Sequence, residues 1–174
     1  MDDKLLAVYA GSFDPVTLGH LDLIERSARL FDEVVVAVGR HATKTAFFSF
    51  GERVDLLREV TRDIANVRVE SFEGLLIHFC ERIGARVIVR GLRAATDFEY
   101  ELQIAHANAD MVPRVDTVFL PTRTNYGFVS ASLVREIASH GGDVSHYAPP
   151  VVCAALATKL GRGAEHPRPD GQKV

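Results

Sequence analysis

Five short apolar runs, rich in valine and isoleucine, recur along the 174-residue chain with little polar alternation. They lie at residues 5–9, 33–38, 67–69, 86–89 and 117–120. Runs of this kind are typical of strands that are covered on both faces. Helical patterns separate or follow them, at residues 21–31, 53–64, 75–83, 98–109 and 133–139. The alternation predicts an α/β fold with a doubly wound parallel sheet of five strands, flanked by helices.

Local signals mark two helix starts and one helix end. Ser49 precedes Glu52, and Thr96 precedes Glu99, at the spacing of a capping box. In such a box each side chain accepts a hydrogen bond from the backbone N–H of the other residue. We expect Gly141-Gly142 to end the helix before it, because glycine adopts the left-handed conformation at helix ends without strain.

Length and composition predict one domain with a short tail. Of the 174 residues, 47% are hydrophobic, which suffices for one core of ordinary size. After Leu160 the chain becomes rich in glycine, proline and charged residues, which cannot offset the entropy of ordering. We therefore expect a single domain over residues 1–160 and a disordered tail over residues 161–174.

Charge and hydropathy exclude several classes of partner. The formal net charge is -3, so no overall basic field attracts nucleic acid. The first apolar run is short and follows Asp2 and Asp3, unlike a signal peptide, and no run approaches the length that spans a bilayer. We expect a cytoplasmic protein with no membrane partner, in which Cys80 and Cys153 are reduced.

The segment from Gly11 to His20 follows the first apolar run directly. A glycine turn between a buried strand and a helix start directs backbone N–H groups toward one point, where a phosphate can bind. His20 stands at the start of the next helical pattern, so we expect its imidazole to face the same anion. The spacing is neither G-x-G-x-x-G nor G-x-x-x-x-G-K-[ST], which disfavours a dinucleotide oxidoreductase and a kinase-type phosphate loop.

Polar residues follow several predicted strands, where an open parallel sheet binds its ligands. Arg40, His41 and Lys44 follow the second strand, Arg90, Gly91 and Arg93 the fourth, and residues 122–132 the fifth. Together with Ser12 and His20 they form a cationic set without paired carboxylates at metal-ligand spacing. Such a set suits charge neutralisation on a phosphoryl group better than acid–base hydrolysis, and it predicts no metal site built from protein ligands.

Each of these features also has a purely structural interpretation. Lys44 alone is compatible with a solvated loop charge. Arg90 has possible ion-pair partners in Glu99 and Glu101. The serines at 130 and 132 stand where a helix N-cap is expected, although their hydroxyls and the free N–H groups there also suit a phosphate. The helical pattern leaves Tyr100 and Glu101 away from the core residues.

Four segments together resemble the bacterial phosphopantetheine adenylyltransferases, a family of the nucleotidyltransferase superfamily with a T/H-x-G-H motif. The segments are residues 11–20, 88–93, 97–101 and 129–135. The first alone is similar to the superfamily, whereas Arg90-Gly91-Leu92-Arg93 followed by Asp97-Phe98-Glu99-Tyr100-Glu101 is more particular to this family. The resemblance covers residues 5–160. It departs from the family at Ser12, where threonine is usual, and at Ala131, which lacks a hydroxyl.

The resemblance implies a Rossmann-like fold and reversible AMP transfer from ATP to 4′-phosphopantetheine, with Mg²⁺, giving dephospho-CoA and pyrophosphate in coenzyme A biosynthesis. Attack is expected to be direct and in line, without a covalent intermediate. A homohexamer, and coenzyme A as a feedback ligand, are further expectations of the resemblance. Two alternatives stay open: a related transferase that uses nicotinate mononucleotide or an alcohol phosphate as acceptor, and a nucleotide-binding module without activity.

The resemblance also implies roles for individual residues. The expected catalytic residues are His20, Lys44 and Arg93. The expected acceptor-binding residues are Ser12, Lys44, Leu76 and Arg90. The expected ATP-binding residues are Ser12, Phe13, His20, Gly91, Leu92, Arg93, Glu101, Tyr126, Gly127, Phe128, Val129, Ser130, Ala131 and Ser132.

Overall fold

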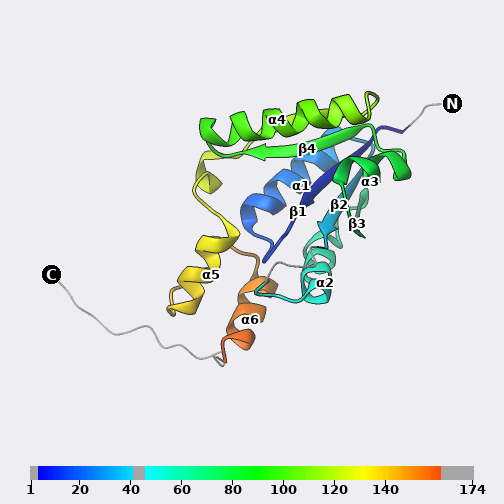
Figure 1. Ribbon diagram of the computed structural model, residues 1–174. Helices are drawn as coiled ribbons and strands as arrows, with labels where there is room; N and C mark the ends of the chain where they lie inside the picture. The colour runs from blue at the N-terminus through cyan, green and yellow to red at the C-terminus, as the bar shows by residue number, and fades with distance from the viewer. Residues whose placement is uncertain (1–3, 41–45, 162–174) are drawn as a thin grey trace.

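The computed structural model describes residues 4–40 and 46–161 (Figure 1). Within them five strands form one sheet in the order β3-β2-β1-β4-β5, and each neighbouring pair is parallel. The strands are β1 (Leu6–Gly11), β2 (Glu33–Gly39), β3 (Val67–Phe72), β4 (Val87–Leu92) and β5 (Asp116–Pro121). The predicted doubly wound parallel sheet is therefore confirmed, and the predicted tail beyond residue 161 lies outside the described residues.

Helices cover both faces of this sheet. The helices are α1 (Leu18–Leu30), α2 (Phe50–Thr61), α3 (Leu76–Ile83), α4 (Ala95–Met111), α5 (Ala131–Ser139) and α6 (Pro150–Lys159), with a short 3₁₀ helix η1 (Thr124–Tyr126). Side chains of α1, α2, α5 and α6 share one apolar cluster with Ala7 and Tyr9 of β1. Ile77 and Phe79 of α3 share a second cluster with Leu6 and Val8, which point to the opposite face. Figure 1 shows α4 lying along β4.

The strands run one to three residues beyond their predicted carboxyl ends. Arg90 and Gly91 pair with Phe119 and Leu120, so they belong to β4 and not to the loop after it. Gly11 likewise pairs with Val38 inside the sheet. Strands pair through backbone hydrogen bonds, which need no apolar side chain. A hydropathy pattern therefore does not predict the polar and glycine residues that end a strand.

The helix signals are partly confirmed. Ser49 caps α2, its hydroxyl accepting from the Glu52 N–H at 3.3 Å while the Glu52 carboxylate accepts from the Ser49 N–H at 2.6 Å. The second predicted capping box is wrong, because α4 begins one residue before Thr96 and its N-cap, Ala94, has no side-chain hydrogen bond. Helix α6 was not among the predicted helices. No helix in the described ranges has the length and apolarity needed to cross a bilayer.

The sheet opens between β1 and β4. These strands are in register from Ala7 and Val87 to Tyr9 and Val89. Beyond that point β1 continues beside β2, and β4 continues beside β5. The order of the sheet reverses here, and the split between two neighbouring strands leaves a crevice at their carboxyl ends.

Candidate active site

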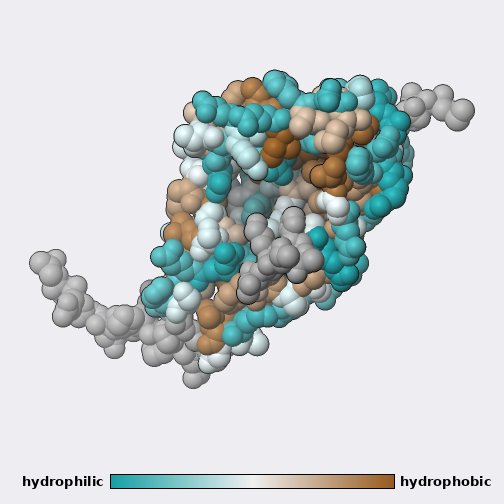
Figure 2. Space-filling model, viewed as in Figure 1, coloured by the Kyte–Doolittle hydropathy of each residue, from teal (hydrophilic) through white to brown (hydrophobic). Residues whose placement is uncertain are grey.

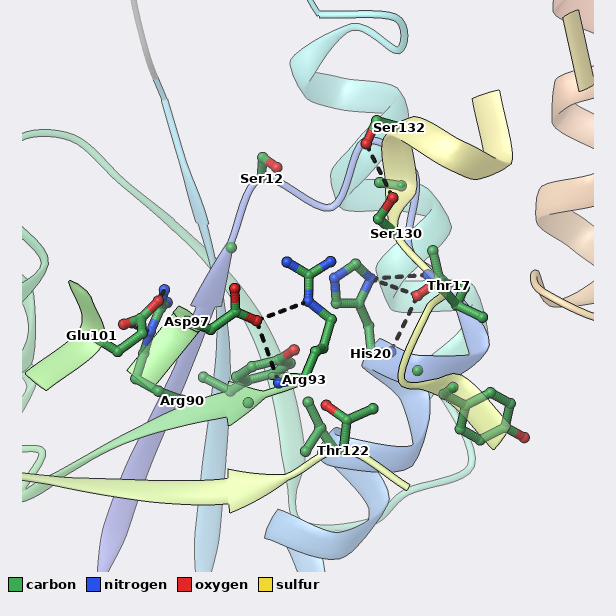
Figure 3. Close-up of a pocket in the computed structure, with 18 of the residues that line it drawn as sticks. Ser12, Thr17, His20, Arg90, Arg93, Asp97, Glu101, Thr122, Ser130 and Ser132 are labelled. Carbon is green, nitrogen blue, oxygen red and sulfur yellow. Dashed lines mark hydrogen bonds and ion pairs between the residues drawn. The ribbon is translucent and has the colours of Figure 1, made fainter. Parts of the chain in front are cut away.

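A cavity of about 590 Å³ occupies this crevice (Figure 3). Its walls are the end of β1, the first turn of α1, the end of β4, the start of α4 and the segment 122–135 that leads into α5. Side chains distant in sequence therefore face one space. Ser12, His20, Arg93 and Ser130 come from four of these walls.

The turn after β1 is held from within the protein. Phe13 adopts a positive φ of 46° and is only 1% exposed. Its ring meets the His20 imidazole edge to face, with 5.1 Å between centroids. The buried Arg53 donates through Nη1 to the Ser12 carbonyl at 2.8 Å. The Ser12 side chain is left exposed at the mouth of the cavity.

His20 is fixed in one tautomer by the start of α1. Thr17 is the N-cap, and its backbone N–H donates to His20 Nδ1 at 3.0 Å. Because a backbone N–H can only donate, Nδ1 carries no proton and Nε2 carries it. Burial, with the nearby positive charge of Arg93, lowers the pKa of His20 to about 4. The imidazole is therefore neutral at physiological pH and offers one N–H donor.

Arg90 reaches the cavity from the end of β4. Its Nε and Nη2 donate to the two carboxylate oxygens of Glu101 at 2.8 and 2.5 Å, in the bidentate geometry typical of strong ion pairs. Its Nη1 donates to the Ala10 carbonyl at 3.1 Å, across the split between the strands. The ion pair with Glu101 that the sequence left open is thus present, and both of its members line the cavity.

Arg93 pairs with a carboxylate of α4, the helix that also carries Glu101. Its Nε lies 3.3 Å from the Asp97 carboxylate, which also accepts from the Arg93 backbone N–H at 3.4 Å. Asp97 and Glu101 are four residues apart, so one face of α4 holds both arginines. Figure 3 shows the Arg93 guanidinium beside the His20 ring.

The start of α5 supplies hydroxyl groups. Ser130 is the N-cap, and its Oγ accepts from the Leu133 N–H at 3.1 Å. The Ser132 Oγ lies 3.1 Å from that oxygen. Arg135, one turn further along, donates to the Asp14 carbonyl and so ties α5 to the turn after β1. The N-cap interpretation of Ser130 is confirmed, and both serines line the cavity as well.

Comparisons with known proteins agree with these features. A cytidylyltransferase-like family model matches residues 8–137. A phosphopantetheine adenylyltransferase of Heliobacterium modesticaldum is 54% identical over 156 residues, covering 90% of this chain and 93% of the relative. Another, of Thiobacillus denitrificans, is 52% identical over 156 residues, covering 90% and 98%. The chain belongs to the phosphopantetheine adenylyltransferase family. It is therefore a nucleotidyltransferase enzyme.

Solved structures of other adenylyltransferases share the fold of this family member. A nicotinate-nucleotide adenylyltransferase of Vibrio parahaemolyticus superposes with a TM-score of 0.69 at 20% identity, covering 91% of this chain and 96% of that one. The nicotinic acid mononucleotide adenylyltransferase of Plasmodium falciparum gives 0.67 at 15% identity, covering 93% and 100%. At these identities the likeness concerns the fold alone.

Most of the residues that the family resemblance singled out line the cavity. They are Ser12, His20, Arg90, Gly91, Arg93, Glu101, Tyr126, Val129, Ser130, Ala131 and Ser132. Five others are absent from the lining: Phe13, Leu76, Leu92, Gly127 and Phe128. Phe13 instead packs behind His20, and Leu76 lies at the first turn of α3. Lys44 and His41 lie outside the described residues.

The lining also contains seven polar side chains to which the family resemblance assigned no role. They are Tyr9, Thr17, Thr96, Asp97, Tyr100, Thr122 and Arg135. Thr17, Asp97 and Arg135 stood inside the matched segments, so their presence there was the available signal. Thr122 belongs to the polar segment after the fifth strand, and that position was its signal. Within the described ranges, no three histidine, cysteine, aspartate or glutamate side chains come together as a metal site.

Proposed function

We propose that this chain transfers AMP from ATP to the phosphate of 4′-phosphopantetheine, releasing pyrophosphate and forming dephospho-CoA in coenzyme A biosynthesis. The observation that carries the proposal is a crevice at the sheet's switch point that gathers a neutral His20, two arginines and hydroxyls from two turns. The identity of 54% with a phosphopantetheine adenylyltransferase over 90% of the chain supports the same acceptor.

The reaction needs positioning and charge compensation more than a base. An oxygen of the acceptor phosphate, already an anion, forms a bond to the α-phosphorus of ATP, and the bond from that phosphorus to the bridging oxygen of the β-phosphate breaks. Pyrophosphate leaves with those electrons, and no proton is transferred in the step. The carboxylates of Asp97 and Glu101 are both engaged by arginines, which agrees with a site that lacks a general base.

His20 and Arg93 would stabilise the transferring phosphoryl group. The Nε2–H of neutral His20 donates a hydrogen bond to an equatorial oxygen without giving up its proton, and the Arg93 guanidinium adds positive charge on the same side. We assign Lys44 the same compensating role and, with Ser12 and Arg90, the binding of the acceptor phosphate. Leu76 would contact the pantetheine arm.

The nucleotide would bind across the turn after β1, the end of β4 and the start of α5. The proposed contacts are those inferred from the resemblance: Ser12, Phe13, His20, Gly91, Leu92, Arg93, Glu101 and residues 126–132. ATP would arrive as its Mg²⁺ complex, the metal being held by phosphate oxygens and water, as small octahedral cations usually are. The ion-paired state of Asp97 and Glu101 fits a metal that enters with its substrate.

We propose in addition that the enzyme is a cytoplasmic homohexamer to which coenzyme A binds as a feedback ligand. In helix α4 only Asn108 is buried, and the apolar side chains of Phe98 and Met111 are exposed. Leu75, the N-cap residue of α3, is exposed as well. Figure 2 shows apolar side chains at the surface in this region. A surface of this kind fits subunit contacts. Sedimentation equilibrium would return six times the 19.1 kDa chain mass for a hexamer and the chain mass if the proposal is wrong.

Pyrophosphate release tests the reaction directly. The assay compares 4′-phosphopantetheine with nicotinate mononucleotide as acceptors for MgATP, using the native chain, His20→Ala and His78→Ala. His78 is an exposed histidine of α3 outside the cavity and serves as the matched control. Release with phosphopantetheine alone, lost in His20→Ala and kept in His78→Ala, supports the proposal.

Other outcomes contradict the proposal in distinct ways. Release with nicotinate mononucleotide alone would identify a related transferase with a different acceptor. Binding of ATP without release from either acceptor would identify a nucleotide-binding module without activity.

A further inference from the structure

A buried carboxylate lies just behind the cavity. Asp22 stands two residues after His20 on α1, is 8% exposed and is absent from the cavity lining. Its Oδ2 accepts from Arg26 Nη1 at 3.2 Å, and its Oδ1 lies 3.0 Å from Arg123 Nε. We refer to Asp22, Arg26 and Arg123 as the Asp22 cluster. A buried carboxylate requires such partners because desolvation penalises its charge.

The Asp22 cluster ties the end of β5 and the segment that follows it to helix α1. Arg26 Nη1 also donates to the carbonyl of Pro121, the last residue of β5, at 2.8 Å. The next residue, Thr122, makes the last backbone bond to β4, its N–H donating to the Leu92 carbonyl at 2.8 Å. Arg123 forms the ion pair with Asp22 and is the N-cap residue of η1. Two successive points of the chain are thereby held against the helix that carries His20.

The segment fixed in this way becomes one wall of the cavity. The Tyr126 N–H donates to the Arg123 carbonyl at 2.9 Å, and the Val129 N–H donates to the Tyr126 carbonyl at 3.0 Å. Tyr126 also packs on Gly19, where an added Cβ would lie 3.3 Å from the Tyr126 Cβ. Figure 3 shows Thr122 and Ser130 on opposite sides of His20, joined by this segment.

We propose that Asp22 and Arg123 are positioning residues for the nucleotide: through their ion pair they hold residues 122–130 at the distance from His20 that ATP requires. The proposal rests on the proposed function, in which this segment contacts ATP. It predicts an effect on ATP alone, because the acceptor residues Ser12 and Arg90 belong to other walls.

A role in stability alone makes a different prediction. Arg123 is 59% exposed, and Asp22 keeps the hydrogen bond from Arg26 at 3.2 Å when Arg123 is replaced, so the loss of this ion pair changes the free energy of unfolding little. Its loss leaves Asp22 Oδ1 without that partner and frees the start of η1, beside the cavity. We therefore expect Arg123→Ala to keep the melting temperature of the native chain while weakening ATP binding.

The experiment measures the Kd for MgATP by titration calorimetry, together with KM for both substrates and kcat. The variants are Arg123→Ala, Arg123→Lys, Asp22→Asn and the double variant. Arg114→Ala is the matched control, because Arg114 is 61% exposed and pairs with Glu81 outside the cavity. We expect Arg123→Ala to raise the Kd and KM for ATP about three- to tenfold. The kcat and the acceptor KM stay within about twofold, as do all values in Arg114→Ala, and lysine restores part of the loss.

The double variant decides between positioning and direct contact. If Arg123 acts through Asp22, the Arg123→Ala change has no further effect once Asp22→Asn is present. A full additional loss in the double variant would mean that Arg123 touches ATP itself and would overturn the proposal. An unchanged ATP Kd in Arg123→Ala would overturn it equally. The calorimetric Kd needs no acceptor, so these outcomes are distinct from a failure of the proposed reaction.

Discussion

Replacing His20 by glutamine removes a titratable group from the cavity while keeping the start of α1. Glutamine is a usual partner of threonine at this position of a capping box, and its amide oxygen takes the place of His20 Nδ1 as acceptor for the Thr17 N–H. The fold is therefore expected to persist. What changes is the coupling between folding and protonation, since the native imidazole is held neutral.

The size of this coupling follows from the pKa of His20, which falls from 6.5 in the unfolded chain to about 4 in the folded one. Between these values the unfolded chain binds more protons, so the folded state loses stability as pH falls. The stabilisation is fully present above pH ~6.5 and is lost progressively toward pH ~4. From pH ~7.5 to pH ~5 the loss due to His20 amounts to about 2 kcal/mol.

Urea denaturation at these two pH values measures the effect. The native chain and His20→Gln share every other titrating group, so the difference between their two pH-dependent losses isolates His20. We expect the native chain to lose about 2 kcal/mol more than the variant on going from pH ~7.5 to pH ~5. Equal losses in the two proteins would show that the imidazole titrates normally and would refute the lowering of the His20 pKa by burial.

Three further substitutions test the local structure by urea denaturation. Thr17→Val should destabilise the protein by about 1–2 kcal/mol, because the His20 N–H loses its cap; a loss below about 0.5 kcal/mol would contradict the capping geometry. Ser130→Ala should cost about 1 kcal/mol for the same reason at α5, and an unchanged midpoint would count against it. Gly91→Ala would place a Cβ 2.3 Å from Cδ1 of the buried Leu23 and should cost about 1–3 kcal/mol. Gly51→Ala meets nothing within 4 Å and is its control; equal midpoints would refute the overpacking argument.

The sheet was predictable because buried parallel strands carry a strong signal. Runs such as Val34 to Val38 are wholly buried and apolar. Strand ends were not predictable to the residue, since Arg90 and Gly91 pair through their backbones. The start of α4 was missed because Ala94 has no capping side chain, and Thr96 matched a motif that the chain does not use there.

The site was predictable as a set of chemical groups but not as a geometry. Sequence placed Ser12, His20, Arg90 and Arg93 at strand ends, and topology brings them to one crevice. The partner that each charged side chain selects depends on contacts between segments that are distant in sequence. That Arg90 selects Glu101 and that Asp22 selects Arg123 follows from packing alone. No local pattern of residues encodes such choices.

The pairing of Arg90 and Arg93 with carboxylates of α4 makes the binding of an anion by these two arginines an exchange of one anion for another. A phosphate that binds Arg90 or Arg93 displaces or shares the carboxylate already paired with that arginine, so its affinity there reflects the difference between two ion pairs. The net field of the cavity is then weak, and association should depend on ionic strength less steeply than its arginines suggest. When such a phosphate leaves, the helix carboxylate returns to its arginine, so each of the two arginines has an anionic partner before and after binding.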